Sequence, residues 1–140
     1  MTTGARASFR GPVRAHLDEA QRLIAACGRN TNANDPGSIA DAVEAVGARV
    51  SDHLEPLIGH RAVEALLARA VYMSKPGFDV LNRVSTAEVN IANVARDVAL
   101  RLRSAKTANA REVAISVFGN FVWLLTRFIG EDLGLRLLRE

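Results

Sequence analysis

Apolar residues recur along this chain at intervals of three and four, the spacing of one face of an α-helix. Glycine or proline separates most of the segments that carry this pattern. No segment shows the strict alternation of apolar and polar residues that is typical of a strand. The sequence therefore predicts an all-α protein, a single-domain bundle of five or six helices. The expected helices cover residues 12–27, 38–58, 60–73, 85–104, 109–129 and 131–138.

Local signals give the expected ends of these helices. Pro12 follows Gly11 and is placed at the first helical position, where its missing N–H has no consequence. Ser38 is the expected cap of the second helix, and residues 85–88 have the spacing of a capping box before the fourth. Val13 and Leu17 open the expected buried stripe of the first helix, and Leu57 closes that of the second.

Length and composition agree with one folded domain. The chain has 140 residues, of which 49% are hydrophobic, and a chain of this length can bury enough surface for a self-sufficient core. Residues 1–10 are mostly small and polar, so we expect a flexible N-terminal segment followed by one helical domain over residues 11–140.

The second half of the chain resembles the first at an offset of 71 positions. The helix expected at 38–58 ends at Gly59, and the helix expected at 109–129 ends at Gly130. Leu54, Ile58 and Leu67 have counterparts in Leu125, Ile129 and Leu138. Two interpretations are open: a structural repeat of three helices, or a coincidence between two leucine-rich helices. A repeat predicts that both glycines follow the last helical residue with φ near +60°.

Residues 113–126 form a run of fourteen residues without a charge. As a helix this run is about 21 Å long, shorter than the roughly 30 Å hydrocarbon core of a bilayer, so a transmembrane span is not expected. A helix without a polar face is central in a bundle or lies in an oligomer interface. We expect the helix at 109–129 to be central, with self-association as the alternative and an apolar ligand pocket as a further one.

Aromatic side chains and the amide of Asn120 make this helix a candidate interface or ligand site. A buried amide needs hydrogen-bond partners, and a polar residue in an apolar seam can specify the register of pairing. The interface or ligand candidates are Phe118, Asn120, Phe121, Trp123 and Phe128.

Charge is distributed unevenly along the chain. Residues 31–60 sum to −4 and residues 91–120 to +3, although the net charge of the whole chain is only +3. Such polarity suits self-association or an oppositely charged protein partner. The basic run could also contact phosphates, but it has no interleaved aromatic residues and no recognition helix, so nucleic-acid binding is not expected. The run consists of Arg96, Arg101, Arg103, Lys106 and Arg111.

Two charged couples follow the two glycines, His60-Arg61 after Gly59 and Glu131-Asp132 after Gly130. An acidic couple suits the positive end of a helix dipole, whereas a basic couple does not. The basic couple could therefore bind an anion or meet the acidic couple across a pseudo-dyad. The spacing of the three histidines matches no metal motif, and no metal or other cofactor is expected.

Enzymatic motifs are absent: the chain has no nucleophile elbow, no glycine-rich phosphate loop and no cysteine pair. The single cysteine, Cys27, and the lack of a secretory leader favour a cytoplasmic protein. The expected function is a noncatalytic helical interaction or regulatory module that self-associates. The alternatives are a sensor or carrier of an apolar small molecule beside residues 109–129, and phosphate or nucleic-acid binding through residues 96–111.

Overall fold

The computed structural model describes residues 12–27, 35–84, 93–105 and 109–139, and these ranges form six α-helices with no strand. The expected flexible segment, the capping box at 85–88 and Lys106 lie outside the described residues. Two short 3-10 turns, Lys75–Gly77 and Asp79–Arg83, follow the third helix. The helices are α2 (Arg14–Cys27), α3 (Pro36–Ile58), α4 (His60–Ser74), α5 (Val94–Ala105), α6 (Ala110–Ile129) and α7 (Glu131–Arg139). The all-α bundle is confirmed.

Three helix starts differ from the predictions. The helix predicted over 85–104 does not run through Asn93: α5 begins at Val94, and the side-chain oxygen of Asn93 accepts the N–H of Arg96 at 2.9 Å. α3 begins at Pro36 with Asp35 as its cap, because the Asp35 carboxylate accepts the backbone N–H of Ser38 at 2.9 Å. Asp followed by Pro combines a strong cap with a residue suited to the first helical position, so the cap prediction at Ser38 was wrong. α2 begins at Arg14 rather than Pro12, and the Nδ1 atom of His16 accepts the N–H of Val13.

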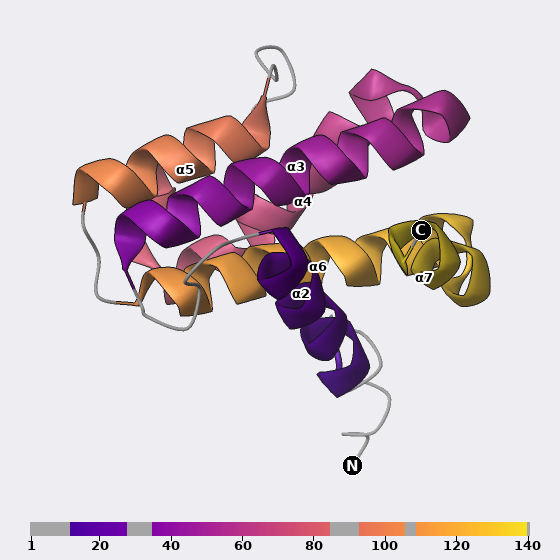
Figure 1. Cartoon of the computed structure of the whole chain (residues 1–140), viewed down its shortest axis with the longest axis horizontal. Coiled ribbons are helices and arrows are strands. Elements are labelled where there is room, and N and C mark those ends of the chain that lie inside the picture. Colours follow the sequence, from indigo (N-terminus) through magenta and orange to yellow (C-terminus); the bar gives the residue numbers. More distant parts are fainter. Residues whose placement is uncertain (1–11, 28–34, 85–92, 106–108, 140) are drawn as a thin grey trace.

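The helix α6 lies at the centre of the bundle, as predicted (Figure 1). It contacts α2, α3, α4 and α7, and eleven of its twenty residues are buried. α6 and α3 run in the same direction along the long axis of the molecule, with α2 crossing α6 and α5 lying along α3. The absence of a polar face on residues 113–126 is thus accounted for by packing within one chain.

A glycine lies where α5 packs against α3 and another where α2 packs against α6. A Cβ atom built on Gly47 of α3 would lie 2.4 Å from the Cβ of Ala95 in α5, and one on Gly119 of α6 would lie 2.6 Å from Cδ2 of Leu17 in α2. Both distances are below van der Waals contact, so only glycine permits these crossings without a shift. Each long helix therefore receives the short helix of the other half of the chain.

Gly59 and Gly130 have matching backbone conformations, with φ and ψ of 89° and 156° at the first and 97° and 150° at the second. The N–H of each donates to the carbonyl four residues earlier, Glu55 and Thr126 respectively, at 2.8 Å. Their position after the last helical residue is as predicted. Their ψ values are extended rather than left-handed helical, because a new helix starts at the next residue and the chain must turn without a loop.

The matched junctions and the exchanged short helices are features that a two-half architecture predicts. Equivalence of the halves as wholes stays a prediction, since α4 spans fifteen residues and α7 only nine. The buried stripes were predicted less well at their ends. Val13 and Leu57 are exposed, whereas Leu23 in α2 is buried and was not on the predicted stripe.

Candidate functional site

The aromatic candidates on α6 separate into buried and exposed residues. Phe118 and Phe121 are fully buried and belong to the core of the bundle. Trp123 is half-buried, with the guanidinium of Arg127 5.1 Å from the centroid of its ring. Phe128 is 58% exposed. Of the four aromatic side chains, only those of Trp123 and Phe128 can contact a molecule outside the bundle without rearrangement.

Asn120 has its partner inside the chain. Its Nδ2 atom donates to the hydroxyl of Ser74 in α4 at 2.8 Å, and the hydroxyl of Ser116 donates to the same oxygen at 3.1 Å. The Ser74 hydroxyl in turn donates to the carbonyl of Ala70 at 2.9 Å. This buried network fixes how α4 and α6 align, so the register function considered for Asn120 is satisfied within one chain.

The two long helices end at the same end of the molecule, where each is followed by a glycine and a shorter helix (Figure 1, right). We call this region the junction end. Three of the six exposed large apolar side chains of the described residues belong to it: Leu57 (59% exposed), Phe128 (58%) and Leu133 (42%). Leu57 and Phe128 are counterparts at the 71-residue offset, each two residues before its glycine. The junction end is the candidate interaction surface.

The charged couples also lie at the junction end. The imidazole of His60 pairs with the carboxylate of Glu55 at 2.6 Å, and Arg61 is exposed. Glu131 and Asp132 are exposed at the start of α7, and the Glu131 carboxylate acts electrostatically on His16 of α2. These interactions do not join the basic couple to the acidic one, so they provide no support for the intramolecular pseudo-dyad contact.

The basic run is largely neutralised by acidic residues of the same chain. The guanidinium of Arg103 pairs with Asp41 at 2.6 Å and with Glu44 at 3.0 Å, and these bonds raise the pKa of Arg103. Arg101 lies 3.6 Å from Asp97. The uneven charge of the sequence thus leads to contacts between α5 and α3.

The other residues of the run give little support to a phosphate site. Arg111 is half-buried and makes an interaction within the chain, Arg96 is exposed, and Lys106 lies outside the described residues. The described part of the run does not present a continuous basic surface.

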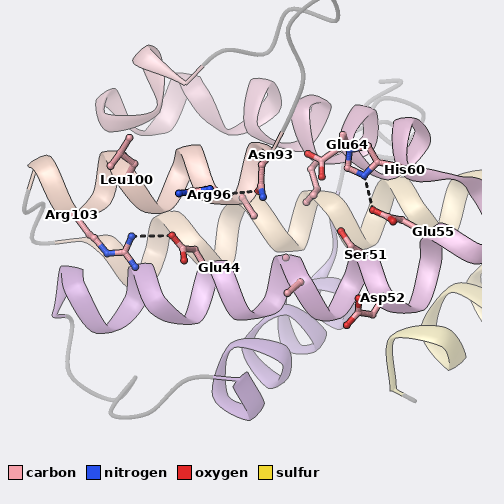
Figure 2. A pocket seen from close by; sticks show the side chains of 14 residues that line it. Glu44, Ser51, Asp52, Glu55, His60, Glu64, Asn93, Arg96, Leu100 and Arg103 are labelled. Carbon is pink, nitrogen blue, oxygen red and sulfur yellow. Dashed lines mark hydrogen bonds and ion pairs between the residues drawn. The ribbon is translucent and has the colours of Figure 1, made fainter.

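An open cleft of about 710 Å³ lies between α3, α4 and α5 (Figure 2). Its polar groups are mostly paired with one another. Glu44 is held by Arg103 at one end, and Glu55 by His60 at the other. Glu64 is only 4% exposed and accepts the backbone N–H of Val94 at 2.9 Å, which stabilises the start of α5. The cleft is therefore a polar contact region between α3, α4 and α5.

Neither this cleft nor a second cavity of about 300 Å³ near the 3-10 turns is lined by the aromatic residues of α6. The lining residues of the second cavity are Pro76, Gly77, Phe78, Asp79, Val80 and Asn109. The two cavities give no support to an apolar ligand site beside Phe118, Phe121 or Trp123.

Sequence reasoning missed two buried carboxylates, Glu64 and Glu19. The Glu19 carboxylate, 4% exposed, accepts hydrogen bonds from Arg22 and from Arg139 of α7, the latter at 3.3 Å. Nearby, burial lowers the pKa of His16, and the Glu131 carboxylate partly opposes this shift. A charged residue on an otherwise apolar helix face was the only available signal, and without a partner in view it does not distinguish a buried acid from a solvated one.

By length and composition α6 could cross a membrane, but half of its most apolar stretch is buried inside the molecule. A core helix passes the same test, and α6 contacts four other helices, as a core helix does.

Within the ranges that the structure describes, no group of three or more His, Cys, Asp or Glu side chains is arranged to hold a metal ion. The comparisons add no relative: the chain matches no protein-family model, no curated protein and no solved structure.

Proposed function

We propose that this protein is a noncatalytic helical interaction module that self-associates through the junction end. The observation that carries the proposal is that three of the six exposed large apolar side chains of the described residues, Leu57, Phe128 and Leu133, belong to the helix ends that meet at the junction end. Exposed apolar side chains gathered in one region mark interaction surfaces more often than single ones do. A cytoplasmic setting is part of the proposal, since the chain has a single cysteine.

A second copy of the chain is the occupant that the charges of the junction end favour. Arg61 and Arg127 contribute two positive charges there, and Glu131 and Asp132 contribute two negative ones. A surface that carries both signs can be complementary to itself, as an interface around a two-fold axis requires. A strongly basic or acidic partner would instead meet like charges.

The exposed apolar area is modest, so the expected dimer is weak. Stable interfaces bury about 800 Å² on each partner, and smaller ones belong to transient complexes. Three partly exposed apolar side chains, with the charged residues around them, favour a dissociation constant in the micromolar range, about −8 kcal/mol or weaker. Self-association should therefore depend on concentration.

Sedimentation velocity of the intact chain and of two variants tests the proposal. The double variant F128S/L133S removes apolar contacts at the junction end, and the control Y72S removes a residue that is 60% exposed near the other end of α4. We expect the wild type and Y72S to sediment as a monomer–dimer mixture and F128S/L133S as a monomer of 15.1 kDa. Circular dichroism should show that all three remain folded, because exposed substitutions change stability little.

A wild type that remains at 15.1 kDa up to about 100 μM would refute self-association at physiological strength. Loss of the dimer in Y72S as well as in F128S/L133S would place the contact elsewhere on the molecule. The apolar-ligand and phosphate-binding alternatives predict that none of these substitutions changes the sedimentation.

A further inference from the structure

Charged residues of opposite sign follow two glycines that have matching backbone conformations. His60 and Arg61 begin α4, and Glu131 and Asp132 begin α7, 71 positions later. The backbone geometry of Gly59 and Gly130 is the same within about ten degrees, so each couple leaves its long helix in the same way. Two equivalent positions at one end of the molecule therefore present a positive and a negative group.

Local helix stability accounts for the acidic couple but not for Arg61. Carboxylates at a helix N-terminus are stabilised by the positive end of the helix dipole, and Glu131 and Asp132 lie there. A guanidinium at the same position of α4 is opposed by the dipole. The placement of Arg61 thus has a small local cost, which an interaction outside its own helix would offset.

Arg61 does not find this interaction among the described residues of its own chain. His60 is engaged by Glu55 in the preceding helix. For the described residues, no ion pair or hydrogen bond of the side chains of Arg61, Glu131 or Asp132 is found within the chain, and all three are exposed. Glu131 acts on His16 only at longer range. Both signs are therefore available to a partner at the junction end.

We propose that two copies dock around a two-fold axis so that Arg61 of each copy lies against Glu131 and Asp132 of the other. This inference rests on the proposed function and adds the pairing that sets its register. In an isologous dimer each contact occurs twice, so one basic and one acidic couple per chain give two equal ion-pair contacts. Leu57, Phe128 and Leu133, which belong to the same end of the molecule, supply the apolar part of the interface. Charge pairs at the rim of an interface fix orientation more than they add affinity.

Charge reversal tests the pairing directly. In R61E both contacts of a homodimer bring like charges together, and in D132R each contact is weakened in the same way. We expect each variant alone to dissociate about tenfold more readily than the wild type, since two exposed charge contacts are lost. An equimolar mixture of R61E and D132R should associate more tightly than either variant alone. One contact of the heterodimer is that of the wild type, and the other places the introduced carboxylate beside the introduced guanidinium, although Glu131 still opposes it.

The control is R69E, an equal change of charge on the same helix about 12 Å from Arg61. It should associate as the wild type does. Sedimentation velocity at low salt measures all five samples, the wild type, R61E, D132R, their mixture and R69E. The differences in affinity should shrink as salt screens the exposed charges.

The outcomes separate this inference from the proposed function. If the wild type dimerises, F128S/L133S does not, and the mixture of R61E and D132R is no tighter than either variant alone, the junction end is an interface but the pairing is wrong. If R69E weakens the dimer as much as R61E, the effect is one of net charge and the pairing is also wrong. If the wild type is monomeric, the proposed function itself has failed.

Discussion

Replacing Gly47 by Ala should weaken the bundle more than the same change at Gly119. The added Cβ at Gly47 would lie 2.4 Å from the Cβ of Ala95, well inside the 3.5 to 4.0 Å at which carbon atoms normally meet. The Ala95 methyl group is attached directly to the backbone and has no rotamer that avoids the clash. The two helices must therefore separate by about 1 Å, which typically costs 1 to 3 kcal/mol.

The gain in helix propensity offsets part of this cost. Alanine is more favourable than glycine inside a helix by about 1 kcal/mol, so the net loss for Gly47→Ala is about 1 to 2 kcal/mol. At Gly119 the clash is with Cδ2 at the tip of the Leu17 side chain, at 2.6 Å. Leu17 is only half-buried and can change rotamer, at about 1 kcal/mol, so Gly119→Ala should be neutral within about 1 kcal/mol.

Urea unfolding followed by circular dichroism measures both variants, with the free energy of unfolding taken by linear extrapolation. The double variant G47A/A95G removes the methyl group that causes the clash and should show favourable coupling of about 1 kcal/mol or more. A Gly47→Ala protein as stable as the wild type, or a double variant without coupling, would show that α3 and α5 are not held at this distance.

Three further predictions concern stability. Gly59→Ala and Gly130→Ala should each lower the free energy of unfolding by about 1 to 3 kcal/mol, and by similar amounts. No atom lies within 4 Å of the added Cβ at either position, so only the backbone strain that the two glycines share acts. Unequal losses of stability in urea unfolding would contradict the equivalence of the junctions. Ser74→Ala should lower the free energy of unfolding by about 1 to 3 kcal/mol, because the buried Asn120 amide loses its acceptor. The double variant S74A/N120L should lose less stability than the sum of the two single variants. Additive losses would refute the network. Burial lowers the pKa of His16, so the unfolded state binds this proton more readily than the folded state; the contribution of His16 to stability is fully present above the unfolded value of 6.5 and is lost as the pH falls through the lowered folded pKa. His16→Gln should reduce this loss in urea midpoints measured from about pH 7 to pH 5, and an unchanged pH dependence would show that other groups cause it.

The helices were predictable where apolar spacing and a glycine or proline stop agreed. α6 and its end at Gly130 follow from the pattern, as does the α4 stop at Ser74. The start of α3 was predicted two residues late, because a serine cap was preferred to an aspartate cap followed by proline. The sequence carries both signals, and proline at the first helical position favours the aspartate cap.

The candidate site was predictable only in part. Periodicity alone placed Phe118, Phe121 and Phe128 together, whereas the fold buries the first two and exposes the third. Leu57 and Phe128 each lie in the last turn of a long helix and are exposed. The pairing of Arg103 with Asp41 and Glu44 joins residues about sixty positions apart, and no local pattern indicates such a contact.

The central claim is that the junction end is where two copies meet. Concentration-dependent nuclear magnetic resonance spectra of the intact chain, labelled at leucine methyl groups and phenylalanine rings, test it most directly. Between about 10 and 500 μM the signals of Leu57, Phe128 and Leu133 should shift along a common binding curve, while those of Leu100, exposed on α5, should stay in place. Shifts confined to Leu100, or no shift at any of these residues, would contradict the account.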